Sequence, residues 1–535
     1  MRPVSARRGA RIVAAVAVVA LASAGCGGSG DAGGGNAFSV AITEPDHLTP
    51  AQTTSSYSLQ VGESLFDPLT MIDPKTKKVS NLSAESIKSS DQRHWTIKIK
   101  PGLRFSNGEP VTAKSFVDAW NTAAYGPNGW AANYYFANIE GYDALNPEDE
   151  KAEPKAKKLS GLKVKDDTTF TVALSEPYSQ FPMTLAVNCF SPLPKEGLSD
   201  FKKFDNHPIG NGPYMMDGDW QHNKQIKVKK NPKYKGPRAG HADEVTFKSY
   251  ASRDAAYTDL AAGKTDALAT IPAAKVPDAK KTFGDRFRAV PGGTMDYLGF
   301  PLFEKKYDNL KLRQAISMAI DRNGIVKSVY NGAYKPMGSL VPPIVPGYRA
   351  NPCGEYCQYN PTKAKQLLKE AGGFDGTMNL WFSNADPTYR AWMQAIANLL
   401  KQNLGIDAKF RQVPAADYLD TLSSHDEDGP YRQNWIMDYP SPENYLANQW
   451  GVDNRMGWKG PDYEKFLSLI KKGNASPDQE AAVPYYQQAE DVALKDMTLI
   501  PLWNWQDQSA WSDRLSNVIN DPIVGFHVES IKVSS

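Results

Sequence analysis

The sequence predicts an α/β protein whose strands run in mixed directions and whose chain builds two or three lobes. Strand patterns and helix patterns alternate from one end of the chain to the other. A chain of 535 residues is also longer than one ordinary hydrophobic core accommodates. No single linker rich in Pro, Gly or Ser divides it into two halves, and this favours lobes that several chain crossings join.

The first 25 residues have the layout of a secretory signal peptide. Arginines precede a ten-residue apolar stretch, 12–21, and small residues follow it up to Cys26. The stretch is too short to span a bilayer, which needs about 20 residues. The residues SAG before Cys26 resemble the bacterial lipoprotein box, although Ser23 replaces the usual leucine. We expect a lipid on Cys26, a flexible spacer over 26–36 and an extracytoplasmic body; a plain cleaved signal is the alternative.

The composition argues against nucleic-acid-binding and membrane-spanning classes. Four of the 61 basic residues lie in the signal peptide, which leaves 57 against 59 acidic residues in the mature chain. The sequence has no basic tail, no aromatic–basic RNA motif and no zinc-finger spacing. No second apolar stretch approaches membrane length. We therefore expect that the chain contacts the membrane through its lipid anchor only and has no permease function. We also expect a monomer.

Three segments predict half-buried strands. HWTIKIK (94–100) alternates polar and apolar residues and places three large apolar side chains on one face. TFTVAL (169–174) and IKVKK (226–230) show the same period of two. The charged segment 147–158 predicts a solvated surface loop.

Two helices are predicted from residues at their ends. Thr112 is expected to cap a helix whose buried stripe includes Phe116 and Trp120. Asn360 is expected to cap the segment NPTKAKQLLKEAGG, in which a proline occupies the first turn and Gly372 ends the helix.

Two further helices follow towards the C-terminus. One begins at Asp386, carries an apolar stripe and ends at Gly405. The other is expected to begin with Ser476 as the cap, in a capping box with Gln479, and to be kinked at Pro484.

The cysteines are sparse, and two of them predict a disulfide. Cys353 and Cys357 lie in NPCGEYCQYN, where Pro and Gly favour a tight turn, and an exported chain permits the bond. A structural zinc site is the rival, but such a site needs four ligands and no histidine lies nearby. Cys189 is then expected to be a free, buried thiol.

A series of motifs resembles the extracytoplasmic solute-binding proteins of peptide-importing ABC transporters, the family that contains oligopeptide- and dipeptide-binding proteins (family 5). The motifs keep the family's order and cover nearly all of residues 38–506. They are SLFDPLTMIDP, WTIKIKPGLRFSNGEPVTAKSFVDAW, HPIGNGPY, NPKYKG followed by DEVTFKSY and AAGKTDAL, LRQAISMAIDRNGIVKSVYNGAYKP, and YNPTKAKQLLKEAG.

The resemblance implies a periplasmic-binding-protein-like fold of type II, with two hinged lobes that enclose the ligand. Lobe I is expected to hold residues 37–290 and 510–535, with an extra subdomain over about 63–186 that is typical of the larger class. Lobe II is expected to hold residues 291–509.

The segment YRQNWIMDYPSPENYL (431–446) resembles the family's pattern R-x-x-W-x-x-D-Y-x-x-P-x-x-aromatic-L. By this resemblance Asp438 binds the peptide's N-terminal ammonium, Trp435 packs on the ligand and Arg432 is available to the C-terminal carboxylate. Residues 434–437 are implied to be extended backbone that pairs with the peptide. Expected ligand-binding residues in this segment are Arg432, Asn434, Trp435, Ile436, Met437, Asp438 and Tyr439.

Other readings of these residues remain open. If one strand holds both, Arg432 and Asp438 share a face at most about 20 Å apart. Asp438 is otherwise a turn aspartate before prolines, Arg432 a surface salt-bridge residue and Trp435 a core residue.

Three positions elsewhere in the sequence are further candidates. Glu44 lies in ITEP, which matches the family's opening segment, and this segment borders the cleft in the family. Tyr389 and Arg390 open a helix after LWFSN, where a carboxylate anchor or simple exposure is possible.

Enzyme classes find no support in the sequence. There is no HExxH, no G-x-S-x-G and no G-x-G-x-x-G after a strand, and the histidines are scattered. Carboxylates are plentiful, so a glycosidase-like pair of acids stays open as an alternative. Such a pair needs two acids that face one cleft, which the sequence does not show. We expect no metal and no cofactor.

The leading hypothesis is that the protein captures oligopeptides outside the cytoplasm and delivers them to the permease subunits of an ABC transporter. The sequence has no phosphate-binding loop, so the ATPase is expected to be a separate chain. One alternative keeps the fold with another solute: an oligosaccharide, a metal complex, glutathione or haem. Another is a receptor that senses peptides for signalling.

Overall fold

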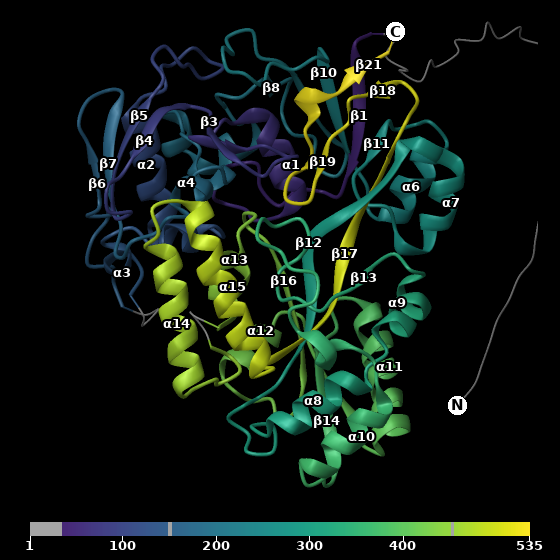
Figure 1. Cartoon of the computed structure of the whole chain (residues 1–535). Coiled ribbons are helices and arrows are strands. Elements are labelled where there is room, and N and C mark those ends of the chain that lie inside the picture. Colours follow the sequence, from purple (N-terminus) through teal and green to yellow (C-terminus); the bar gives the residue numbers. More distant parts are fainter. Residues whose placement is uncertain (1–34, 148–151, 451–453, 535) are drawn as a thin grey trace, which may run out of the picture.

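The computed structural model describes residues 35–147, 152–450 and 454–534. The expected signal peptide and the expected lipid site at Cys26 lie outside these residues. Figure 1 shows two lobes, one above the other. The core of the upper lobe, lobe I, is built from residues in 38–267 and 511–531. The core of the lower lobe, lobe II, is built from residues in 295–503.

One mixed sheet of 11 strands runs through both lobes. Its order is β15-β14-β16-β12-β17-β11-β1-β10-β9-β8, and β13 pairs with β17 beside this path. Strands on the lobe I side are β1 (Ala37–Ile42), β8 (Tyr214–Met216), β9 (Gln225–Lys230), β10 (Glu244–Ser249) and β11 (Ala267–Leu268). Strands on the lobe II side are β13 (Lys335–Pro336), β14 (Thr377–Ser383), β15 (Asp407–Val413) and β16 (Tyr431–Ile436).

Two long antiparallel strands, β12 (Phe287–Gly299) and β17 (Leu499–Trp511), connect the lobes. Their register shifts between Pro291 and Met295, and we call residues 291–295 and 504–506 the crossing. At the crossing, neighbouring side chains lie close to the backbone of two glycines. A Cβ atom on Gly293 would lie 2.9 Å from the Met437 side chain, and one on Gly292 would lie 2.9 Å from the Asp507 carboxylate. A larger residue at either position would therefore displace the neighbouring side chain.

Lobe I contains a second sheet, with the order β4-β5-β7-β6. Its strands are β4 (Ala84–Lys88), β5 (His94–Ile99), β6 (Leu162–Val164) and β7 (Thr169–Ala173). Strand β5 alternates exposed and buried residues as predicted, and α2 (Ala113–Ala124) packs on the sheet with Phe116 and Trp120 fully buried. Thr112 caps α2 in a capping box with Ser115. These residues belong to the same core as the rest of lobe I.

The remaining elements of lobe I are short. Its other helices are α1 (Ser56–Leu65), α3 (Tyr142–Leu145), α4 (Phe181–Thr184), α5 (Phe201–Asn206), α6 (Arg253–Ala261) and α7 (Val276–Phe283). Its small strand pairs are β2 (Thr70–Ile72) with β3 (Val79–Asn81), β18 (Leu515–Ser516) with β21 (Lys532–Val533), and β19 (Asn520–Asp521) with β20 (Gly525–Phe526). Residues 152–158 of the charged loop are exposed or half-buried, and its residues 148–151 lie outside the described part.

Helices dominate the periphery of lobe II. They are α8 (Leu310–Ala319), α9 (Arg322–Tyr330), α10 (Pro361–Glu370), α11 (Pro387–Leu404), α12 (Tyr418–Ser423), α13 (Pro442–Trp450), α14 (Pro461–Asn474) and α15 (Gln479–Lys495). Asn360 caps α10 and Asp386 caps α11, both as predicted. Gly405 ends α11 in the left-handed conformation, where it costs no Cβ strain.

The predicted start of α15 was wrong. Asp478, and not Ser476, is the N-cap, and its carboxylate accepts a hydrogen bond from the Ala481 amide at 2.8 Å. The Ser476 hydroxyl instead donates to the carbonyl of Lys472 at the end of α14. The helix runs uninterrupted through Pro484, which lies near its N-terminal end.

The cysteines are arranged as the sequence predicted. Cys353 and Cys357 form a disulfide with a Cα–Cα distance of 5.7 Å, in the turn that contains Gly354. Cys189 is free and buried in lobe I, and this burial raises the pKa of its thiol.

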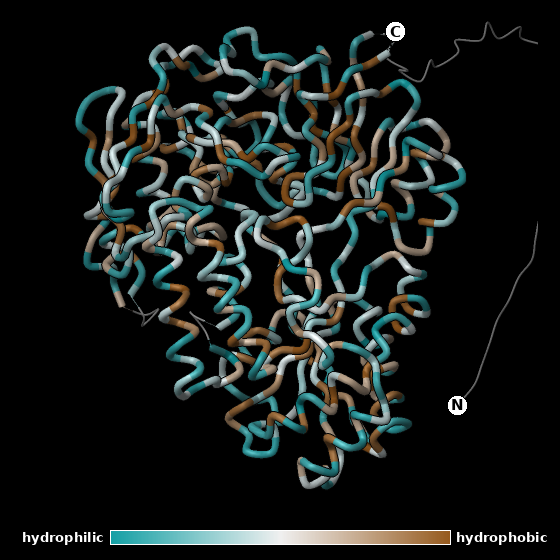
Figure 2. Tube along the Cα trace, in the orientation of Figure 1, coloured by the Kyte–Doolittle hydropathy of each residue, from teal (hydrophilic) through white to brown (hydrophobic). Residues whose placement is uncertain are grey.

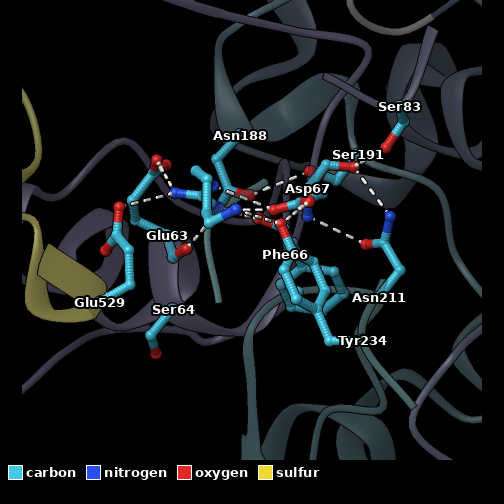
Figure 3. A network of polar contacts seen from close by, with 12 residues as sticks. Glu63, Ser64, Phe66, Asp67, Ser83, Asn188, Ser191, Asn211, Tyr234 and Glu529 are labelled. Carbon is cyan, nitrogen blue, oxygen red and sulfur yellow. Dashed lines mark hydrogen bonds and ion pairs between the residues drawn. The ribbon is translucent and has the colours of Figure 1, made fainter. Parts of the chain in front are cut away.

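A buried ionic network within lobe I connects helix α1 with the C-terminal tail. The guanidinium of Arg238 lies 2.5 Å from Glu63, 2.6 Å from Asp67 and 3.4 Å from Glu529. Figure 3 shows these three carboxylates converging, with the Tyr234 hydroxyl donating to Asp67. Burial raises the pKa of Glu63 to about 7, whereas Arg238 and His527 overcome the effect of burial and lower the pKa of Glu529 to about 2. Arg238 therefore ties α1 to the C-terminal tail.

Hydropathy follows this architecture. Apolar segments of the chain gather inside the two lobes, while hydrophilic segments lie mostly at the outer loops (Figure 2). Among the described residues, no helix is long and apolar enough to cross a membrane.

Candidate functional site

The carboxyl ends of parallel strands lead towards the region between the lobes. In lobe I, β1 runs parallel to β10, and Glu44 follows β1. In lobe II, β14 runs parallel to β15, and Tyr389 lies in the first turn of the helix that follows β14. Open α/β sheets bind their ligands at such strand ends.

Asp438 lies at the contact between the lobes. Its carboxylate accepts hydrogen bonds from the hydroxyls of Tyr135 at 2.6 Å and Tyr134 at 3.2 Å, both in lobe I. The side-chain amide of Asn444 in lobe II donates to its other oxygen at 3.0 Å. All three donors are neutral, and burial raises the pKa of Asp438. Among the described residues, no lysine or arginine forms an ion pair with this carboxylate. The site is therefore electrostatically suited to a cation from outside.

Strand β16 offers an unpaired edge next to Asp438. It pairs with β12 along its whole length but with β14 at Tyr431 alone. The Arg432 carbonyl accepts from the Tyr418 hydroxyl, on the side away from β12. Because backbone groups of alternate residues face the same edge of a strand, those of Asn434 and Ile436 face this side too. The Ile436 side chain is 46% exposed, so this edge is accessible to an extended chain.

Arg432 is not available in the way that the sequence suggested. It is buried and forms an ion pair of 3.0 Å with Asp296, and its guanidinium stacks on the Tyr389 ring with a distance of 3.6 Å to the ring centroid. Asp296 also accepts hydrogen bonds from the indole N–H groups of Trp503 and Trp505. This buried pairing fits neither a surface salt bridge nor an arginine that awaits a carboxylate.

The shared strand face of Arg432 and Asp438 was also a wrong expectation. β16 ends at Ile436, and the Met437 amide then donates to the Gly293 carbonyl at the crossing. Asp438 lies in the turn that follows, where the Asn444 side chain accepts from its amide. Its position is thus set by the crossing and by α13, and not by the strand period.

The other candidates of this segment have mixed environments. The half-buried Trp435 donates its indole N–H to Asn444. Met437 is buried against the crossing. Tyr439 is buried and donates its hydroxyl to the Glu443 carboxylate at 2.7 Å.

The candidates outside the segment separate into two groups. Glu44 follows β1 in lobe I, where it accepts from the Ser249 hydroxyl and lies 3.4 Å from the His222 ring. Tyr389 is held beneath Arg432. Arg390 is exposed and lies over the Phe410 ring, on β15 at the far edge of the sheet. The structure therefore does not bring Arg390 together with the others.

Two cavities lie between the lobes. The smaller, of about 70 Å³, is lined by Asp438 from lobe II and by charged residues of lobe I, including Lys77, Arg238 and Asp521. The larger, of about 800 Å³, lies between the β4–β7 region and helices α13 and α15, and its lining includes Trp95 and Tyr486. None of the predicted ligand residues lines the larger cavity. We take the site at Asp438 as the candidate functional site because it combines an unmatched carboxylate with an open strand edge.

A second buried carboxyl, Glu443, also connects the lobes. The Tyr178 hydroxyl of lobe I donates to it at 3.0 Å, and the Tyr439 hydroxyl donates at 2.7 Å. Burial raises the pKa of Glu443 to about 7, even though the two hydroxyls act to lower it.

The raised pKa of Glu443 predicts a pH-dependent contribution to stability. Between pH 4.5 and 7 the unfolded chain releases this proton while the folded protein keeps it, so the free energy of unfolding falls by about 1.4 kcal/mol per pH unit. Glu443→Gln cannot ionise. Its free energy of unfolding relative to wild type should therefore rise by about 2–3 kcal/mol from pH 4.5 to pH 8 in urea titrations. A difference that does not change with pH would contradict this assignment.

Three features of the site were missed from the sequence. Tyr134 and Tyr135 are separated from Asp438 by about 300 positions, and no local pattern links them. The stacked pair of Tyr334 and Trp505 likewise forms only when β17 passes the segment before β13. The aromatic cluster in ANYYFAN (132–138) was the one sequence feature that could have pointed to Tyr134 and Tyr135.

The family assignment follows from the match over most of the chain. Residues 78–457 match the bacterial extracellular solute-binding proteins, family 5. The chain belongs to this family, and it therefore has the two-lobed fold of solute-binding proteins. Among the described residues, no group of three or more potential ligands could hold a metal ion.

Individual relatives agree with this assignment. The chain is 26% identical over 508 residues to the oligopeptide-binding protein OppA of Bacillus subtilis, with 91% of each chain covered. The unliganded open form of the murein tripeptide-binding protein MppA has a TM-score of 0.80 at 23% identity, covering 94% of this chain and 98% of that one. Haemophilus influenzae OppA in complex with the peptide RPPGFSPFR has a TM-score of 0.71 at 21% identity, covering 94% and 99%.

Proposed function

We propose that this protein captures oligopeptides outside the cytoplasm and delivers them to the permease of an ABC transporter. The observation that carries the proposal is Asp438, a buried carboxylate at the interlobe contact whose donors are all neutral. A peptide's α-ammonium supplies the missing positive charge. Desolvating that ammonium without such a partner would be costly.

The backbone of the peptide finds a partner in the open edge of β16. Asn434 and Ile436 can pair with an extended chain that starts at Asp438. Pairing of this kind uses main-chain groups and accepts many side chains. The protein acts here as a binder, and no reaction is assigned to it.

The relatives support a peptide as the solute. The Bacillus subtilis relative is named for oligopeptide binding, and the Haemophilus influenzae structure contains a peptide of nine residues. We propose the lobe limits 37–290 with 510–535 and 291–509, so that closure bends the chain at the crossing.

Mass spectrometry of retained peptides tests the proposal. The purified protein is mixed with a library of random pentapeptides with free termini, desalted and examined under native conditions. We expect ions that carry one pentapeptide, and much weaker retention of the same library after N-acetylation. Retention of neither library, together with a sugar or metal complex on the protein as purified, would contradict peptide capture.

We also propose that the protein is a monomeric lipoprotein tethered at Cys26. The apolar stretch 12–21, the residues SAG and the glycine-rich spacer motivate this anchor. Cys26→Ser should abolish labelling by a radioactive fatty acid and release the protein into the medium or leave it unprocessed. Acyl labelling of the variant at the wild-type level would refute the anchor.

A further inference from the structure

Arg253 is a cation of lobe I without a charged partner. It is the first residue of α6, it is exposed, and it follows the carboxyl end of β10. Its Nε donates to the Tyr57 hydroxyl at 3.1 Å. Among the described residues, no carboxylate pairs with it. Its two terminal nitrogens, which form a fork that matches a carboxylate, therefore remain available.

Two aromatic side chains of lobe II stack on each other beside the crossing. The rings of Tyr334 and Trp505 stack at 5.1 Å with an interplanar angle of 13°, and both side chains are half-buried. The Trp505 indole donates to Asp296, whose charge is already matched by Arg432. This pair therefore offers apolar contact but no uncommitted cation.

Arg253 and this aromatic pair belong to different lobes. In Figure 1, α6 lies above β13, the strand that follows Tyr334. Burial raises the pKa of the Tyr334 hydroxyl, and the guanidinium of Arg253 acts in the opposite direction.

We propose that Arg253 binds the C-terminal carboxylate of the captured peptide against the Tyr334–Trp505 pair. This inference rests on the proposed function, because it assumes a peptide whose ammonium lies at Asp438. A carboxylate enclosed between the lobes needs a cation, and Arg432 is occupied by Asp296. Since Arg253 lies in lobe I and Asp438 in lobe II, the two ends of one peptide then hold the lobes together. A ligand with both charges thus favours the closed arrangement over the open one.

Calorimetric titration with matched libraries tests this inference. Wild type, Arg253→Gln and Arg253→Lys are each titrated with random pentapeptides that have a free N-terminus and either a free acid or an amide at the C-terminus. Arg390→Gln is the matched control, because Arg390 is an exposed arginine over Phe410. Melting temperatures within about 2 °C of wild type establish that each variant is folded.

We expect Arg253→Gln to weaken the free-acid library by about 10- to 100-fold and the amide library by less than about threefold. Arg253→Lys should recover part of the loss, and Arg390→Gln should bind both libraries like wild type. Equal loss for both libraries, or no loss for either, would overturn the role of Arg253 while peptide capture by wild type stands. Wild type that binds neither library would overturn the proposed function itself.

Discussion

Asp438→Asn is expected to weaken the binding of free-amine peptides by roughly two to three orders of magnitude. The variant leaves the α-ammonium enclosed between the lobes with neutral partners only, namely Tyr134, Tyr135 and Asn444. Breaking a buried ion pair typically costs about 3–5 kcal/mol, and each 1.4 kcal/mol is about tenfold in affinity. Calorimetry with one retained pentapeptide measures the effect.

The N-acetylated form of the same peptide is the control. It carries no ammonium, so it should bind wild type poorly and lose little further in Asp438→Asn. A double-mutant-cycle treatment of the four affinities isolates the charge interaction from packing. If both peptides lose affinity equally, or neither does, Asp438 is a structural turn residue and the ammonium lies elsewhere.

Arg238→Met is expected to cost about 3–5 kcal/mol of unfolding free energy, the largest loss of stability that we predict. The arginine is 6% exposed and is the cation among three carboxylates, Glu63, Asp67 and Glu529. Methionine fills part of the volume but leaves these acids buried without their cation. Urea titrations at pH 7 measure the loss.

Two comparisons distinguish this electrostatic cause from lost packing. The loss in Arg238→Met should shrink at pH 4, because the three acids can then be neutral in the folded protein. Arg93→Met removes an ion pair with Glu140 whose side chains are 42% and 35% exposed, and it should cost about 1 kcal/mol or less. A loss below about 1 kcal/mol in Arg238→Met would show that the network contributes little to the fold.

The parts of the structure that the sequence predicted are those fixed by neighbours along the chain. Thr112, Asn360 and Asp386 cap their helices through hydrogen bonds to amides two or three residues ahead. The disulfide joins cysteines four positions apart across one turn. The α15 cap was misplaced because two residues close together, Ser476 and Asp478, can both cap, and the end of α14 takes the serine.

The site was only partly predictable, because its chemistry depends on contacts between the lobes. The resemblance led to Asp438 and to the β16 segment. It did not reveal that Arg432 is matched by Asp296, since their separation of 136 positions leaves no local pattern. Tyr135 and Arg253 were missed for the same reason. Each of them acquires a role only when the sheet brings both lobes to the crossing.

A crystal structure of the protein saturated with one retained pentapeptide tests the central claim most directly. We predict that the α-amino nitrogen lies within about 3.2 Å of an Asp438 carboxylate oxygen. The peptide backbone should pair with the β16 edge at Asn434 and Ile436, between lobes that have closed. A peptide whose N-terminus lies away from Asp438, or one seated in the cavity lined by Trp95 and Tyr486, would contradict the account.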